Sequence, residues 1–262
     1  MKKLACIFLT LAVCASCSVK EDRDACPSFL RLTVTRQAGN VYQDGLAWCG
    51  MYDGDGTRWA VSPLTRMDVR DTLLRYAVSP RRTVRAVVSS SEAVSGRVEP
   101  QTGEEFPKLY AYGKDVVCLD ELVNDIIYQQ DKQYCNLTVQ LSEVAVPLAP
   151  ELVVSVDAPY SGTLFPSLEP CTGHYLYRTV FDASGRASLR LPRQGGEGLR
   201  LMVQKPDAFS SGYDLYEEMR RAHYDWASPS LSDFEITVSL NSVEGDLVVE
   251  DWTIVDIPGK EF

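Results

Sequence analysis

The chain has 262 residues, of which 45% are hydrophobic and 24% are charged, so it can fold around a substantial core. Lys and Arg total 26 against 36 Asp and Glu, and the net charge of -10 argues against a nucleic-acid partner, because binding to phosphates needs a positive surface. The two histidines, His174 and His223, lie far apart without metal-ligand spacing, which excludes histidine-rich metal chemistry.

The N-terminus carries the pattern of a secretory leader. Met1, Lys2 and Lys3 form a short basic region, and residues 4–15 form an apolar run of about twelve residues. Because a membrane-spanning helix needs about 20 apolar residues, this run is too short to cross a bilayer. The sequence therefore predicts a lipoprotein-type signal peptide over residues 1–16.

The end of this leader, Cys14-Ala15-Ser16-Cys17, resembles a lipobox, the signal for cleavage before a cysteine that carries a diacylglycerol. The resemblance implies lipid attachment at Cys17, with acyl chains such as palmitate anchoring the mature chain. Two alternatives stay open. Attachment at Cys14 would put Leu11 at the start of the motif and Val13 before the cut, and the leader could instead be an ordinary signal peptide with an incidental cysteine.

Residues 17–27 form a charged tether with two further resemblances. Lys20, Glu21 and Asp22 resemble the signal that sends lipoproteins of Bacteroides-type bacteria to the outer face of the outer membrane. The whole tether is similar to the start of the fimbrial anchor lipoproteins of these bacteria, the FimB-type or minor-fimbrium anchoring subunit family. A merely solvated tether between lipid and fold explains the same charges, and both interpretations can hold.

The resemblance to this family implies a fold of two tandem transthyretin-like β-sandwich domains and a structural function in cell adhesion. The protein would be a surface-exposed lipoprotein of the cell outer membrane that tethers a fimbrium (pilus), binds a fimbrial stalk subunit and limits fimbrial length by ending assembly. It also implies that the anchor is not cleaved as stalk subunits are, because cleavage would remove the strand that joins it to its lipid.

Beyond the tether, apolar residues alternate with polar ones at a period of two, which is typical of strands with one buried face. Turn residues separate these segments, so the expected fold class is all-β. The prolines of Val146-Pro147-Leu148-Ala149-Pro150 suit a linker, which divides the chain into an N-terminal sandwich over residues 28–147 and a C-terminal one over residues 148–262. The expected strands include residues 30–34, 84–88, 135–141, 152–156, 175–181, 187–191, 199–203, 236–240 and 247–257.

Helical patterns are scarce. Leu119–Tyr128 and Tyr213–Ala222 could each form two or three turns, and we expect both as short insertions on the β framework.

Beyond Cys17 the number of cysteines is odd, so they cannot all pair internally. Cys118 and Cys135 lie in apolar, strand-like segments, and we expect both to be small buried hydrophobic residues. The full set is Cys26, Cys49, Cys118, Cys135 and Cys171.

Motifs with catalytic or metal-binding chemistry fail on inspection. Asp53-Gly54-Asp55-Gly56-Thr57 begins like an EF-hand loop, but Arg58 stands where Gly is needed and Leu64 where a bidentate Glu is needed. A hairpin turn is the simpler interpretation, with a weak calcium site of another kind left open. His223 and Asp225 would point to different faces of a helix. We therefore expect no catalytic residue, no metal and no cofactor, and we do not expect an enzyme.

The C-terminal run over residues 245–257 has the pattern of a last strand, and Asp-Trp near the end also resembles the anchor family. Pilus subunits of this class join by strand addition, in which main-chain hydrogen bonds complete another subunit's sheet. The candidates for strand exchange are Leu247, Val249, Trp252 and Ile254. The alternative is an internal edge strand of the second sandwich.

Two functions from different classes follow from these patterns. The first is a structural fimbrial anchor subunit. The second is a surface glycan-binding lipoprotein of a polysaccharide-uptake system, which shares the leader, the β-sandwich composition and an abundance of aromatic residues.

Overall fold

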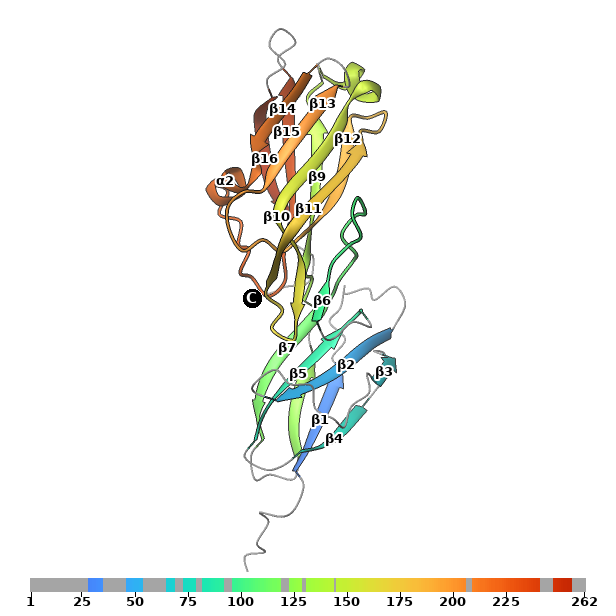
Figure 1. The fold of residues 1–262 in the computed structure, drawn as a ribbon, viewed down its shortest axis with the longest axis vertical. Helices are drawn as coiled ribbons and strands as arrows, with labels where there is room; N and C mark the ends of the chain where they lie inside the picture. The colour runs from blue at the N-terminus through green and yellow to red at the C-terminus, as the bar shows by residue number, and fades with distance from the viewer. Residues whose placement is uncertain are drawn as a thin grey trace, which may run out of the picture.

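The computed structural model describes residues 28–34, 46–53, 65–68, 73–78, 82–91, 96–118, 123–128, 131–143, 145–205, 209–240 and 247–255. These residues form an elongated molecule built almost entirely from strands (Figure 1). Within these ranges, no helix has the length and apolar character needed to span a bilayer. The predicted all-β sandwich class is confirmed.

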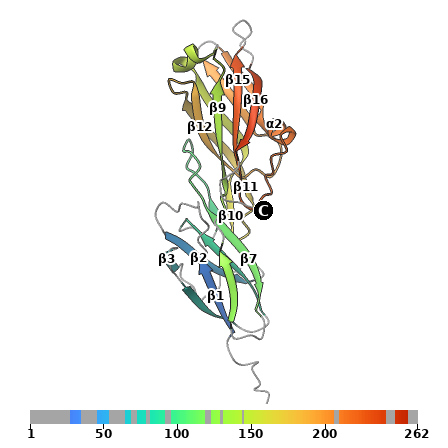
Figure 2. The ribbon, with the colours of Figure 1, turned by 180° about the vertical axis from the view of Figure 1, so that it is seen from behind.

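Eight strands form the sheets of the C-terminal half. They are β9 (Tyr134–Leu141), β10 (Val153–Phe165), β11 (Pro170–Val180), β12 (Arg186–Pro192), β13 (Arg200–Lys205), β14 (Phe209–Asp214), β15 (Asp233–Leu240) and β16 (Leu247–Val255). One sheet has the order β12-β9-β15-β16 and the other has the order β11-β10-β13-β14. Figure 2 brings the first of these sheets to the front.

The core of this half follows from the alternation in the sequence. Along β9, Leu137 and Val139 are fully buried while Thr138 between them is partly exposed, because successive side chains of a strand point to opposite faces. Val154 of β10, Leu201 of β13 and Phe234 of β15 are equally buried and belong to the same hydrophobic cluster. Burial of these inward rows holds the two sheets face to face.

The N-terminal half also contains two sheets. Their strands, with β6 between the halves, are β1 (Ser28–Val34), β2 (Leu46–Asp53), β3 (Thr65–Asp68), β4 (Leu73–Val78), β5 (Thr83–Ser89), β6 (Gly96–Val98), β7 (Ala111–Val117) and β8 (Val123–Tyr128). The sheet orders are β4-β1-β8 and β3-β2-β5-β7. β1 is a central strand, antiparallel to β4 and parallel to β8.

The two sheet pairs have the same topology, although the sequence shows no repeat. β1 pairs antiparallel with β4 and parallel with β8, and β9 pairs antiparallel with β12 and parallel with β15. The order β3-β2-β5-β7 corresponds to β11-β10-β13-β14, and every pairing in both is antiparallel. Among the described strands, β16 is an addition to the repeated arrangement, and β6 lies outside it.

The strand pairings around residue 148 bear on the expected boundary there. β9 precedes that point but pairs with β12 and β15, so it belongs to the C-terminal sheets. The proline-rich segment 146–150 lies within a 3-10 helix, η2 (Val146–Glu151), which connects β9 to β10. The prolines of this segment lie in a connection between strands, as predicted, but that connection joins two strands of the C-terminal sheets. The division into domains 28–147 and 148–262 stays a prediction, and the strand pairings place β9 with the C-terminal sheets.

One of the two expected helices is wrong. Within Leu119–Tyr128, residues 123–128 form β8, which pairs with β1. The β-branched residues of this segment favour a strand once a neighbouring strand is available. The other segment does contain a helix, α2 (Leu215–Arg221), and its N-cap residue Asp214 accepts a hydrogen bond from the backbone N–H of Glu217 at 3.1 Å.

A long hairpin connects the two halves. β10 and β11 extend beyond their other partners, and β6 pairs with the end of β10 at residues 163–165. A Cβ atom on Gly162 would lie 2.1 Å from the carbonyl oxygen of Val98, so only glycine fits this close approach. The hydrophobic cluster of the C-terminal sheets includes Tyr52 and Val87 of the N-terminal half, so one apolar core spans the junction.

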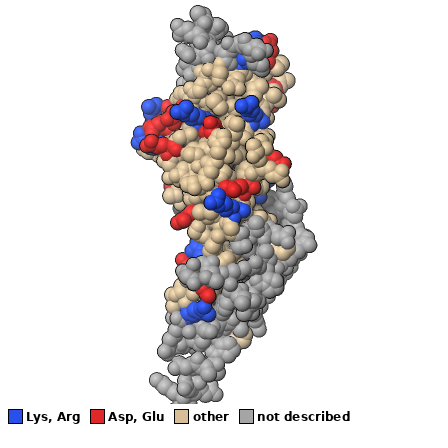
Figure 3. All heavy atoms as spheres, in the orientation of Figure 1, with Lys and Arg blue, Asp and Glu red and all other residues tan. Residues whose placement is uncertain are grey.

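Charged side chains of both signs are scattered over the face shown in Figure 3 and gather over α2. There Arg220 pairs with Glu217, and Arg221 pairs with Glu218. This face of the described residues presents mixed charge rather than a patch of one sign.

Candidate functional sites

β16 forms the outer edge of its sheet. It pairs antiparallel with β15 along its length, and within the described residues its other side carries no strand. A register shift leaves Glu250 as an extra residue, and the side chains of Glu250 and Asp251 are exposed. A bulge and exposed charges are common protections of a sheet edge against uncontrolled pairing.

The four candidates for strand exchange are in register with alternate residues of β15. Ile254 packs against the core, whereas the side chain of Trp252 is 40% exposed. β16 therefore completes its own sheet in this structure, and strand exchange stays a prediction. The registered pairs are Leu247 with Leu240, Val249 with Val238, Trp252 with Ile236, and Ile254 with Phe234.

The predicted membrane anchor lies outside the described residues. This applies to Cys17, the lipid-attachment candidate, and to Lys20, Glu21 and Asp22 of the export signal. It applies also to most of the Asp-Gly turn, residues 54–57. These assignments stay predictions.

Cys118 and Cys135 are fully buried and have free thiols, which confirms their prediction as small hydrophobic residues. Burial raises the pKa of the Cys118 thiol, and it raises the pKa of Cys135 to about 12. A thiol that stays protonated is a poor nucleophile, so neither cysteine is suited to redox or covalent chemistry.

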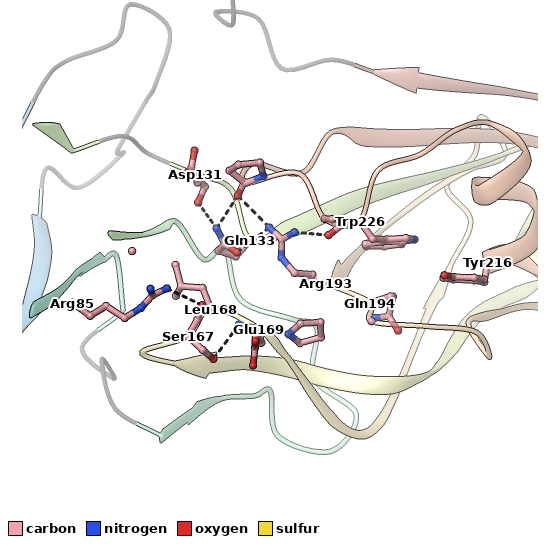
Figure 4. A pocket seen from close by; sticks show the side chains of 15 residues that line it. Arg85, Asp131, Gln133, Ser167, Leu168, Glu169, Arg193, Gln194, Tyr216 and Trp226 are labelled. Carbon is pink, nitrogen blue, oxygen red and sulfur yellow. Dashed lines mark hydrogen bonds between the residues drawn. The ribbon is translucent and has the colours of Figure 1, made fainter. Parts of the chain in front are cut away.

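A second site lies where the N-terminal and C-terminal sheets meet. It is a cavity of about 480 Å³, within the usual size of small-molecule pockets. Segments far apart in the sequence line it, as Figure 4 shows. They are Arg85 of β5, Gly113 of β7, the segment 131–133 before β9, the β10–β11 turn at 167–170, the segment 193–195 after β12, Tyr216 of α2 and the loop 226–229. We call it the junction pocket.

Arg85 fixes one wall of the junction pocket. Its Nε donates to the carbonyl of Pro166 at 2.7 Å, and one terminal nitrogen donates to the carbonyl of Ser167 at 3.0 Å. The other terminal nitrogen binds both carboxylate oxygens of Asp115, at 3.0 and 2.9 Å. The guanidinium of an N-terminal strand thus holds the turn between β10 and β11, and Asp115 balances its charge.

Arg193 organises the opposite wall. Its side chain is 6% exposed, and its terminal nitrogens donate to the carbonyls of Trp226, Ser228 (2.7 Å) and Pro229 (3.1 Å) and to Oε1 of Gln133 (3.0 Å). Burial lowers the pKa of Arg193 from its usual value. A planar guanidinium can hold several carbonyls in one fixed arrangement, so this side chain shapes the loop 226–229.

Gln133 links this network to the N-terminal half. Its Nε2 donates to the carbonyls of Ala111 at 3.0 Å, Asp131 at 3.2 Å and Pro229 at 3.1 Å. The network therefore ties the loop 226–229 to the start of β7.

The histidines do not contribute to either site. Nε2 of His174 lies 3.0 Å from Oδ1 of Asp157 on an exposed part of the surface. His223 follows α2 with a positive φ of 59°. Throughout the described ranges, no three His, Cys, Asp or Glu side chains lie close enough together to hold a metal ion.

The architecture is that of elongated proteins built from successive β-sheet pairs. Solved structures share it, among them the following three. The fimbrial anchor protein Mfa2 from Porphyromonas gingivalis has a TM-score of 0.60 and 11% identity, covering 90% of this chain and 98% of that chain. A candidate adhesin from Bacteroides thetaiotaomicron has a TM-score of 0.57 and 14% identity, covering 88% of this chain and 98% of that chain. A candidate polysaccharide-binding protein from the same species has a TM-score of 0.61 and 7% identity, covering 89% of this chain and 100% of that chain.

At these identities the likeness establishes a shared fold. No protein-family model matches the chain, and no curated protein matches its sequence. The chain thus shares its fold with a fimbrial anchor protein over nearly the whole length of both chains.

Proposed function

We propose that the chain is a fimbrial anchor subunit, a non-enzymatic lipoprotein that tethers a fimbrium to the outer membrane and limits its length by ending assembly. The observation that carries this proposal is the alignment of nearly the complete fold with Mfa2. The resemblance of the N-terminal tether to the start of the anchor lipoproteins supports the same function. The proposal locates the protein at the cell surface and gives it a fimbrial stalk subunit as its partner.

Retention in the membrane would depend on acyl chains at Cys17. A triacylated N-terminus buries enough methylene groups for stable anchoring, whereas a single chain does not. The tether leads directly into β1, whose Leu30 is fully buried. Because β1 pairs on both sides, with β4 and β8, its removal would leave both neighbours unpaired. This position supports a chain from which the lipid-linked strand β1 is not removed by cleavage.

Affinity for the stalk subunit would come from β16. This strand is the addition to the repeated arrangement, so the sheet β12-β9-β15 would keep the pairings of β4-β1-β8 without it. Its outer edge offers main-chain donors and acceptors for an added strand, and Trp252 offers exposed apolar surface next to that edge. These features support strand addition or exchange at β16 as the mode of subunit contact.

The decisive experiment tests anchoring directly. Cells that carry a tagged chain are crosslinked, and the proteins that co-purify are identified in wild type and in Cys17→Ala. We expect fimbrial subunits to co-purify from wild-type membranes, and fimbriae to be shed into the medium when Cys17 is replaced. Recovery of polysaccharide-uptake components, with fimbriae unaffected by Cys17→Ala, would refute the anchor proposal.

A second experiment tests the role of β16. Trp252→Asp places a charge beside the proposed contact and should reduce crosslinking to the stalk subunit several-fold. Val180→Asp, which replaces another exposed apolar side chain on the edge strand β11, is the matched control. Equal crosslinking by the two variants, with both folded by circular dichroism, would rule out contact at β16.

A further inference from the structure

Apolar side chains line the junction pocket without being fully covered. Leu168 and Pro170 of the β10–β11 turn, Tyr216 of α2 and Trp226 are each partly exposed, and Pro229 is exposed (Figure 4). Contact with an apolar segment would remove this surface from water, which is the main favourable contribution to association between protein surfaces. The pocket can therefore gain from an occupant that carries apolar groups.

One acidic side chain of the lining has no ionic partner. Glu169 is exposed, and within the part of the chain that the structure describes its carboxylate forms no ion pair or hydrogen bond. The two arginines of the lining are already engaged, Arg85 with Asp115 and Arg193 with carbonyl oxygens of the loop 226–229. An added cation would therefore complete an ion pair with Glu169, whereas an added anion would meet only arginines that already have partners.

The strand β16 ends beside one wall of the pocket. Val255, its last residue, is in register with Asp233 at the start of β15. Asp233 forms an ion pair with Lys132, and the backbone N–H of Leu231 donates to the carbonyl of Lys132 at 2.9 Å. Because Lys132 lies within the lining segment 131–133, these contacts join the end of β16 to that wall.

Residues 256–262 follow β16 in the sequence and lie outside the described residues; we call them the tail. Registered residues of antiparallel strands are about 5 Å apart, and the path from Asp233 back to the lining residue Pro229 is at most about 15 Å. A segment of the length of the tail spans up to about 25 Å when extended. The tail is therefore long enough to cross from Val255 into the pocket.

The tail carries the side chains that would complete the lining. Its sequence is Asp-Ile-Pro-Gly-Lys-Glu-Phe, in which Pro258-Gly259 is a turn sequence that can redirect the chain after β16. Beyond this turn, Lys260 and Phe262 share one side of an extended chain and Glu261 faces the other. Lys260 supplies a cation, and Phe262 supplies an apolar ring.

We propose that the junction pocket holds the tail of this same chain, with Lys260 paired to Glu169 and Phe262 packed against the apolar lining. Because the tail directly follows β16, its docking would fasten the end of the strand that the anchor proposal uses for subunit contact. The docking itself needs neither the lipid nor a stalk subunit, so either proposal can fail without affecting the other.

Photocrosslinking of the full chain tests the contact. The variant Phe262→p-benzoylphenylalanine keeps an aromatic ring at this position, and on irradiation the benzophenone forms a bond to a nearby C–H group. Mass spectrometry of the digested monomer locates that bond. We expect crosslinks within the chain to residues 168–170, to Tyr216 or to residues 226–229.

Charge reversal in the same chain tests the ion pair. Lys260→Glu should lower the yield of the pocket crosslink about threefold, which is typical of losing a partly exposed ion pair, and Glu169→Lys should do the same. The two substitutions together should restore the yield. Glu143→Lys is the matched control, because Glu143 is an exposed acidic residue outside the lining, and it should leave the yield unchanged.

Three results would overturn the proposal. The first is crosslinks that are spread over the surface instead of gathered in the pocket. The second is a yield that neither charge reversal changes. The third is crosslinks found only in covalent dimers, which would assign the pocket to the tail of a second copy of the chain.

Discussion

The N-terminal and C-terminal sheet pairs share five strand pairings with the same relative directions, yet they differ in what is added to them. The C-terminal pair gains β16 at one edge and lengthens the β10–β11 hairpin, with 13 and 11 residues against 8 and 4 in β2 and β3. The first addition gives an edge strand, and the second reaches the N-terminal half and forms a wall of the junction pocket. Both candidate sites thus include a departure from the repeated arrangement.

The largest expected effect tests whether the two halves share one core. Leu137→Ala removes a fully buried side chain from the C-terminal sheets and should lower the free energy of unfolding by about 3 kcal/mol. Because the hydrophobic cluster includes Val87 of the N-terminal half, Val87→Ala should lower the urea midpoint of the same single unfolding transition. Urea unfolding followed by circular dichroism and tryptophan emission measures both. Two separate transitions, each sensitive to only one substitution, would show that the halves unfold independently.

A smaller effect is expected where the long hairpin meets β6. Gly162→Ala would place a Cβ atom 2.1 Å from the carbonyl oxygen of Val98 and should cost about 2 kcal/mol of stability by forcing β6 away from β10. Gly212→Ala in β14 is the matched control, because its Cβ would meet nothing closer than 3.8 Å. Thermal unfolding should separate the two variants, and similar melting temperatures would contradict the close approach.

The polar network at the junction should contribute slightly less. Arg193→Met keeps most of the side-chain volume but leaves the carbonyls of Trp226 and Ser228 without their donor, and we expect a loss of about 1.5 kcal/mol. Arg200→Met, on an exposed position of β13, should change stability little. Denaturant midpoints of the two variants provide the measurement. Equal denaturant midpoints would mean that water hydrogen-bonds these carbonyls in place of the guanidinium with no loss of stability.

The smallest effect concerns pH. Ser161 donates a hydrogen bond of 2.6 Å to Glu99, and the Cys171 thiol donates one of 3.1 Å, and these bonds lower the Glu99 pKa below its ordinary value of 4.5. A carboxylate whose pKa is lower in the folded than in the unfolded chain stabilises the fold at pH values above its unfolded-state pKa. That stabilisation is lost as the pH falls through the pKa of the folded state.

Glu99→Gln should therefore reduce stability near neutral pH by less than about 1 kcal/mol and flatten its decline below pH 4.5. Thermal unfolding from pH 3 to pH 7 (roughly the range over which carboxylates titrate) would record both curves. Parallel curves for wild type and Glu99→Gln would contradict a lowered pKa.

The sequence predicts the C-terminal strands better than the N-terminal ones, and the reason is burial. β9, β12 and β15 each bury one face, so period-two alternation appears in their sequences. β2 was not expected, because residues 49–52 are all buried and alternation is lost. β14 was missed because its Ser210-Ser211-Gly212 is typical of a loop.

The junction pocket could not be predicted from any local motif. Arg85, Gln133, Arg193 and Trp226 come from four separate segments that only the fold brings together. The sequence does contain one indirect signal at Gly195-Gly196, which reads as a turn. In the structure these glycines lie against the ring of Tyr160, where a Cβ on Gly195 would come within 2.9 Å. Their small size serves close packing beside the pocket as well as the turn.

The place of β1 also determines how the molecule would carry mechanical load. A pull transmitted through the N-terminal segment enters the fold at Ser28 and acts along the axis of β1. Hydrogen bonds to β4 on one side and to β8 on the other run across that axis, so they resist the pull together rather than opening one after another. A strand held on both flanks and loaded lengthwise is a suitable point of attachment, as the proposed anchor function would require.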